Sequence, residues 1–166
     1  VIKVIGKNAF VQVFESTRGM RVGDEAEFEG HMLEVTLGPG MLSRNYDGLQ
    51  NDLDKMEGVF LRRGEYTFPL DNDKLWDFKP LAKVGDKVTA GGWLGEVDEN
   101  FQPHKIMVPF TFKGEYTVKS LKEAGQYTIG EVIAVLTDET GKDVEVTMIQ
   151  RWPVKRAITC YKEKPR

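Results

Sequence analysis

The sequence is poor in cysteine, in histidine and in net charge, and each scarcity removes a class of protein. Cys160 is the single cysteine among 166 residues, so no intrachain disulfide can form, and a reducing compartment fits this composition. The 23 basic and 26 acidic side chains leave a formal charge of −3, which gives no electrostatic basis for a nucleic-acid groove. The two histidines, His31 and His104, have no cysteine or paired carboxylates at ligand spacing. We therefore expect no metal site.

Long apolar runs and nucleotide-binding motifs are also missing. No apolar stretch approaches the roughly 20 residues that span a bilayer, and no basic-then-apolar signal segment opens the chain. We therefore expect no direct membrane insertion. No G-x-x-x-x-G-K-[ST] motif occurs, so the phosphate-binding loop of many nucleotide-hydrolysing proteins is absent. No Ser-His-Asp or Cys-His pairing can be drawn either, and the sequence offers no catalytic, cofactor-binding or metal-binding residue.

Short apolar runs punctuated by glycine make up much of what is there. β-branched and aromatic residues recur at 1–5, 9–14, 31–37 and 133–136, and brief runs with close turns predict the strands of a barrel or sandwich. One helix is expected over residues 47–56, because Leu49, Leu53 and Met56 share one helical face and Asp47 can cap its start. The predicted fold class is therefore all-β with one short helix.

The block from 84 to 136 resembles a carrier domain. Residues 84–97 resemble the opening of biotinyl and lipoyl domains, and residues 125–136 resemble their pseudo-symmetric closing half. Such domains carry their cofactor on a lysine at the tip of the central hairpin, whereas here the tip is expected near Asn100 and Phe101. Lys105 is expected inside a strand, with its ammonium held against the sheet. The carrier fold is predicted without the carrier lysine, and a stand-alone carrier or transfer domain is kept as the alternative function.

The predicted core belongs to the same part of the chain. Residues 60–150 contain both pseudo-symmetric halves and are expected to form a self-contained apolar interior. The side chains expected inside are Trp76, Phe78, Trp93, Ile106, Val108, Ile133 and Val135.

Three separated motifs, kept in order, resemble one protein family. Leu-Gly-Pro-Gly-Met-Leu at 37–42, with Tyr-Asp-Gly-Leu-Gln at 46–50, resembles the exit from the N-terminal β-barrel of the catalytic A subunit of V-type and A-type rotary ATPases. His-Lys-Ile-Met-Val-Pro at 104–109 and Gly-Glu-Tyr-Thr-Val at 114–118 resemble that subunit's insertion, called the bulge or non-homologous region. Met-Ile-Gln-Arg-Trp-Pro-Val at 148–154 resembles the return toward the nucleotide domain. One departure is Asn51-Asp52, which stands where the family usually has Arg-Pro.

The resemblance implies three parts. Residues 1–53 would be the C-terminal part of the N-terminal β-barrel with its exit helix. Residues 54–150 would be the bulge, an insertion domain of the barrel-sandwich-hybrid type, and residues 151–166 would begin a linker toward an absent nucleotide-binding domain. Because residue 1 is Val and already lies in a predicted strand, we expect a piece of a longer chain.

The resemblance also implies a function. The parent protein would couple ATP hydrolysis or synthesis to proton or sodium transport, in the cytoplasm and peripheral to the membrane. The family's phosphate-binding loop, catalytic glutamate and magnesium carboxylate lie beyond the Trp-Pro-Val motif, so this chain alone would be no enzyme, and Mg-ATP is expected only in the missing domain. Its partners would be the B subunits and the stator or peripheral stalk. Exposed strand edges within residues 1–37 are expected to permit self-association.

Overall fold

Strands account for almost all regular structure in the chain. The computed structural model describes residues 3–13, 16–28, 30, 33–56 and 67–160. In that part the elements are β1 (Lys3–Ile5), β2 (Asn8–Phe10), β3 (Glu34–Leu37), the 3-10 turn η1 (Leu53–Lys55), β4 (Leu75–Pro80), β5 (Lys87–Val88), β6 (Trp93–Glu99), β7 (Gln102–Met107), β8 (Tyr116–Leu121), β9 (Gly125–Thr128), β10 (Ala134–Thr137), β11 (Asp143–Val146) and β12 (Gln150–Pro153). The all-β prediction is confirmed.

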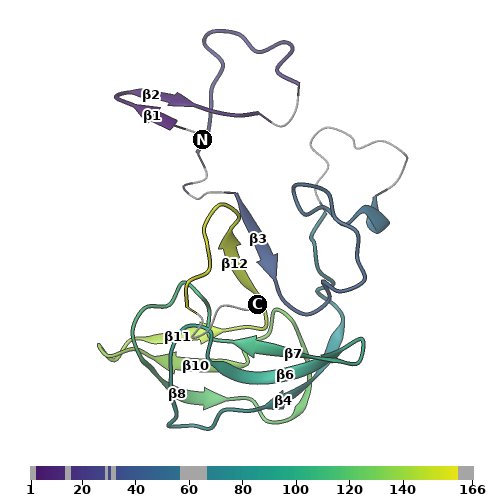
Figure 1. Cartoon of the computed structure of the whole chain (residues 1–166), viewed down its shortest axis with the longest axis vertical. Coiled ribbons are helices and arrows are strands. Elements are labelled where there is room, and N and C mark those ends of the chain that lie inside the picture. Colours follow the sequence, from purple (N-terminus) through teal and green to yellow (C-terminus); the bar gives the residue numbers. More distant parts are fainter. Residues whose placement is uncertain (1–2, 14–15, 29, 31–32, 57–66, 161–166) are drawn as a thin grey trace.

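Two four-stranded sheets form the body of the molecule, in the lower part of Figure 1. One has the order β7-β6-β4-β9 and the other β11-β10-β8-β5, and their neighbouring strands are antiparallel. Side chains alternate between buried and exposed along the strands, as in β4, where Trp76 and Phe78 point inward. We call these two sheets with their connections the sandwich.

The sandwich contains two groups of buried apolar side chains. One comprises Leu70, Trp76, Phe78, Val97, Ile106, Ile129, Ile133 and Met148. The other comprises Leu94, Val108, Val118, Ala134, Leu136 and Val146. The predicted burial of Trp76, Phe78, Ile106, Val108 and Ile133 is confirmed, while Val135 is only half-buried.

Trp93 was wrongly placed in the core, since 56% of its surface is exposed. The pairing of β6 with β7 shifts register between Trp93 and Gly95. This irregularity gives the inward position to Leu94, which is fully buried, and turns the indole outward. There the Lys105 ammonium lies 4.9 Å from the centre of the Trp93 ring, a cation–π contact on the outer face.

The helix predicted over 47–56 is also wrong, because only Leu53–Lys55 forms a 3-10 turn. The Asp47 carboxylate accepts hydrogen bonds from the amides of Leu49 at 2.9 Å and Asn51 at 2.7 Å. These bonds offer the backbone an alternative to the helical ladder. Gln50 has a φ of +64°, which no right-handed helix accommodates. The hydrogen bonds of the Asp47 side chain therefore determine the local conformation, in place of the helix that the apolar spacing predicted.

The N-terminal strands form a separate hairpin. β1 pairs with β2 in antiparallel register, with Lys3 opposite Phe10 and Ile5 opposite Asn8. Every residue of both strands is exposed. In Figure 1 this hairpin lies at the end of the molecule away from the two four-stranded sheets. The strands predicted at 1–5 and 9–14 are thus present in part and contribute nothing to the core of the sandwich.

Candidate functional site

The strand that precedes the sandwich in the sequence pairs with the strand that follows it. β3 pairs antiparallel with β12, with Leu37 opposite Gln150 and Val35 opposite Trp152. Figure 1 shows these two strands side by side above the sandwich. We call this two-stranded sheet the stem. The first and last of the three motifs therefore meet in space although more than a hundred residues of sequence separate them.

One glutamine side chain occupies the free side of β3. The Thr36 amide donates to Oε1 of Gln50, and Nε2 of Gln50 donates to the Thr36 carbonyl, both at 2.7 Å. The Gln50 side chain thus makes the pair of hydrogen bonds that a neighbouring strand would make with Thr36. Its own backbone has a φ of +64°, a conformation that costs a side-chain-bearing residue about 1–2 kcal/mol.

The Gly-Pro-Gly turn follows β3 and packs tightly against the chain that leads into β12. A Cβ on Gly38 would stand 2.7 Å from Cγ2 of Ile149, so only glycine fits there. Pro39 is fully buried, and Gly40 has a φ of +104°. The segment forms a tight turn, and the amides of this turn donate to a carboxylate from another part of the chain.

That carboxylate is the side chain of Glu99, at the end of β6. Oε1 accepts from the amides of Gly40 at 2.7 Å and Leu42 at 2.9 Å, and Oε2 lies 2.6 Å from Nδ1 of His104. Only 2% of Glu99 is exposed, so its charge depends on these partners instead of water. We call Glu99, His104, Gly40 and Leu42 the Glu99 cluster. It joins the sandwich to the turn.

The hairpin tip lies beside this cluster. Asn100 and Phe101 are the two residues between β6 and β7, as predicted, and their φ values are +54° and +64°. Nδ2 of Asn100 donates to Oγ of Ser43 at 3.1 Å, and Ser43 itself has a φ of +62°. With Gln50, these are the four described non-glycine residues of positive φ. Backbone strain is thus concentrated where the turn meets the tip, which marks the junction as a candidate site.

The tip carries no lysine. Lys105 lies within β7, where its ammonium pairs with the carboxylate of Glu96 on β6. Its predicted position against the sheet is confirmed. The Glu96 partner holds the lysine side chain along the outer face, and the hydrogen bond from Lys105 lowers the pKa of Glu96.

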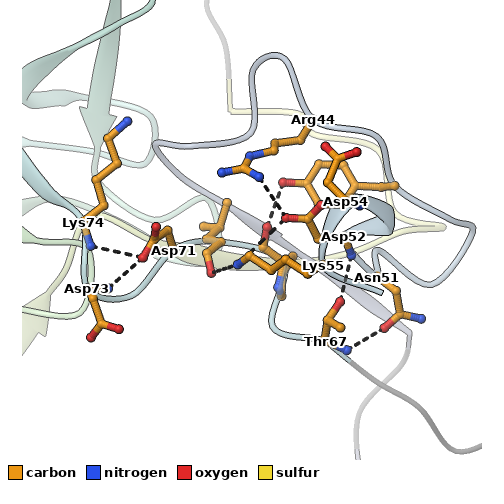
Figure 2. A network of polar contacts seen from close by, with 12 residues as sticks. Arg44, Asn51, Asp52, Asp54, Lys55, Thr67, Asp71, Asp73 and Lys74 are labelled. Carbon is orange, nitrogen blue, oxygen red and sulfur yellow. Dashed lines mark hydrogen bonds and ion pairs between the residues drawn. The ribbon is translucent and has the colours of Figure 1, made fainter. Parts of the chain in front are cut away.

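A second polar network closes the loop that follows the turn (Figure 2). Asp52 is 1% exposed, its amide donates to Oγ1 of Thr67 at 2.9 Å, and the Thr67 amide donates to Oδ1 of Asn51 at 2.9 Å. Arg44 lies 3.4 Å and Lys55 3.9 Å from Oδ2 of Asp52. The two residues that depart from the family's Arg-Pro are therefore buried and hydrogen-bonded.

The polar groups of the junction are bonded to other parts of the same chain. No group of three or more His, Cys, Asp or Glu side chains that could hold a metal ion occurs in the described ranges. A shallow cavity of about 200 Å³ lies beside the Glu99 cluster, between Met41, His104, Phe110 and Gln150. The described helical content also includes nothing long and apolar enough to cross a membrane.

Sequence reasoning missed Glu99 and Gln50 as site residues. A signal for Glu99 existed, because it shares its side of β6 with Val97, two residues earlier, and a carboxylate at an inward strand position needs a partner. Gln50 gave no such signal, since its partner Thr36 lies 14 residues away.

Comparisons with known proteins agree with this architecture. The chain is 47% identical over 167 aligned residues to the V-type ATP synthase alpha chains of Treponema denticola and Borrelia garinii subsp. bavariensis, and 46% identical to V-type ATP synthase alpha chain 1 of Treponema pallidum. These alignments cover 99% of this chain but only 28–29% of the relatives, so the chain spans less than a third of their length. Residues 67–155 match the model of the ATPsynthase alpha/beta subunit barrel-sandwich domain, and the chain belongs to that family.

Proposed function

We propose that this chain is a structural and interaction segment of the catalytic subunit of a V-type or A-type rotary ATPase, which couples ATP hydrolysis or synthesis to proton or sodium transport. The observation that carries the proposal is the identity of 47% across 99% of the chain with V-type ATP synthase alpha chains. The buried polar groups of the junction support a positioning role, because Glu99 and Asp52 are satisfied by the chain itself.

Each part of the chain has a role in this proposal. Residues 1–53 contribute to an N-terminal barrel, residues 54–150 form the bulge, and residues 151–166 lead toward the nucleotide-binding domain. The partners are the B subunits and the stator or peripheral stalk, and the location is cytoplasmic at the membrane periphery. Mg-ATP binds the parent protein outside this chain, so the isolated chain should show no Mg-ATP binding by calorimetry.

Exposed apolar side chains support an interaction role. Val4, Ile5 and Phe10 of the N-terminal hairpin are each more than half exposed. The strand register places Ile5 and Phe10 on one face of the hairpin and Val4 on the other. A two-stranded hairpin with apolar side chains on both faces is marginal on its own, which favours its burial against another part of an assembly.

A chimeric subunit tests the proposal. The corresponding segment of the Treponema denticola alpha chain is replaced by this chain, and assembly with the remaining subunits and ATP hydrolysis are measured. We expect an assembled, active complex, while a control carrying a biotinyl domain in place of residues 67–155 should not assemble. A chimera that folds but never assembles contradicts the proposal, and a lysine-linked biotin or lipoate adduct on this chain, seen by intact mass after co-expression with the ligase, would establish a carrier function instead.

A further inference from the structure

Two of the attachments between the sandwich and the preceding segment lie next to each other in the sequence. The first is the stem, which is a ladder of four residue pairs. A two-stranded ribbon of this length is marginal on its own and bends easily. The second runs through the Gly-Pro-Gly turn, which immediately follows the stem strand β3 and contacts the far end of β6.

We propose that this turn is a carboxylate-binding site whose ligand is the side chain of Glu99, and that the bond locks the sandwich against rotation about the stem. The amides of Gly40 and Leu42 converge on one carboxylate oxygen, at 2.7 and 2.9 Å. Amides of alternate residues in a turn with a left-handed glycine form a concave anion site. Here Gly40 supplies that conformation with its φ of +104°.

The rest of the cluster favours a carboxylate over a neutral amide. Oε2 of Glu99 lies 2.6 Å from Nδ1 of His104, which donates to it when the imidazole carries its proton on that nitrogen. Neighbouring cations are held elsewhere, because Lys105 pairs with Glu96 and Arg44 pairs with Asp52. A glutamine at position 99 can turn its carbonyl oxygen toward the two amides, but its NH2 group then faces Nδ1 of His104, and the charge that strengthens these contacts is lost.

The geometry of attachment explains why the bond acts as a lock. β6 is an inner strand of its sheet, bonded to β7 on one side and β4 on the other. A tether at its end therefore moves with the whole sheet. Two further contacts lie on either side of the same turn. Gly38 packs against Ile149, and the hydroxyl of Ser43 accepts a hydrogen bond from Asn100. Stem and turn together give the sandwich contacts at separated points, which removes rotation about a single hinge.

Chemical rescue tests the binding site in the full chain. In Glu99→Ala, amide exchange at Gly40 and Leu42 should accelerate about 10- to 100-fold, the effect of losing charge-assisted hydrogen bonds, while exchange at Leu136 in the core stays unchanged. Sodium formate should restore protection in a saturable manner, and sodium chloride at equal ionic strength should not. Glu96→Ala removes a carboxylate from the same strand and should change neither amide.

Glu99→Gln keeps the test decisive if the alanine variant fails to fold. This near-isosteric variant keeps a carbonyl oxygen for the two amides but loses the charge, so exchange at Gly40 and Leu42 should accelerate less than in Glu99→Ala. Formate should not restore protection, since the glutamine side chain still fills the site. Unchanged exchange at both amides in either folded variant overturns the carboxylate site. Accelerated exchange in Glu99→Ala that formate does not restore overturns it too, because the turn would then have no anion preference.

Spin-label distances test the lock. Labels on Arg151→Cys in the stem and Lys142→Cys in the β10–β11 turn, in a Cys160→Ser background, report how the stem sits relative to the sandwich; both label sites are exposed. The distance distribution should be narrow in the parent and in Glu96→Ala, should broaden in Glu99→Ala, and should narrow again with formate. A distribution equally narrow in Glu99→Ala overturns the lock.

Discussion

A Cβ atom on Gly95 would stand 2.2 Å from Cε2 of Phe78. It would also lie 2.8 Å from the Lys79 carbonyl oxygen, so the conflict involves the backbone as well as a movable ring. Phe78 is 1% exposed and packs edge-on against Tyr127, with ring centroids 6.2 Å apart. The absence of a side chain at position 95 is therefore what allows the central ring of the core to sit against β6.

Gly95→Ala should destabilise the chain strongly. The added methyl group overpacks a closed core, which typically costs about 1–3 kcal/mol, and the backbone contact places this case at the upper end. Urea denaturation measures the change. Gly48→Ala is the matched control, because its Cβ meets nothing within 4 Å. Equal midpoints for the two variants would contradict the packing argument.

Gln50→Ala should weaken the stem. It removes both hydrogen bonds to Thr36 and leaves the free side of β3 unpaired, for an expected loss of about 1–3 kcal/mol. Gln50→Glu should destabilise the stem more than Gln50→Ala at neutral pH, since a carboxylate oxygen would then face the Thr36 carbonyl. Exchange of the Thr36 amide and urea denaturation report both effects. Gln126→Ala, which loses only an exposed bond to Asp77, should change little.

Part of the fold could be predicted from the sequence alone. The burial of Trp76 and Phe78 in β4 was predicted and is confirmed, and the resemblance to carrier domains located the tip near Asn100 and Phe101. The family motifs added the order of the parts. The fold class followed from the short apolar runs, and the absent carrier lysine from the position of the tip.

The failures share one physical origin. The helix predicted over 47–56 does not form because the Asp47 side chain makes hydrogen bonds with its own loop. Trp93 lies outside the core because the pairing of β6 with β7 shifts register beside it. The Glu99 cluster joins residues 57 and 59 positions apart. Apolar periodicity carries no information about side-chain bonds or about pairing across such separations.

Ile133→Ala and Trp93→Ala should separate core from surface. Ile133 is 1% exposed, so its truncation should cost about 2–5 kcal/mol. Trp93 is 56% exposed, so its truncation should destabilise the chain far less, although tryptophan is the larger side chain. Thermal or urea unfolding of both variants provides the comparison. A larger loss at Trp93 would contradict the outward orientation that the register shift produces.

Asp47 should make the loop before η1 sensitive to acid. Burial raises the pKa of Asp47, but the side-chain and backbone hydrogen bonds from Asn51 and the backbone bond from Leu49 lower it by more, so the net pKa lies below its ordinary value. A lowered folded-state pKa gives stability that is present above the unfolded pKa, about 3.9, and lost as pH falls through the folded value.

The test of Asp47 is a comparison of pH profiles. Asp47→Asn should be less stable than the parent at pH 7, and the difference should shrink as pH falls below about 4. Asp73→Asn is the control, since Asp73 is exposed and its side chain accepts none of the described hydrogen bonds. A difference between parent and Asp47→Asn that is constant from pH 7 to pH 2 would contradict the linkage.

The N-terminal hairpin should either self-associate or exchange its amides rapidly. β1 and β2 pair only with each other among the described strands, and Val4, Ile5 and Phe10 are 64%, 51% and 54% exposed. A lone two-stranded hairpin is marginal in water, and its outer edges can bond a second copy. Light scattering over a concentration series and amide exchange across residues 3–13 decide between the two outcomes. Val4→Lys with Phe10→Lys should abolish any association, because added charge blocks edge pairing. A strict monomer with strongly protected strands would refute the prediction, since protection without a partner requires a hairpin that is stable by itself.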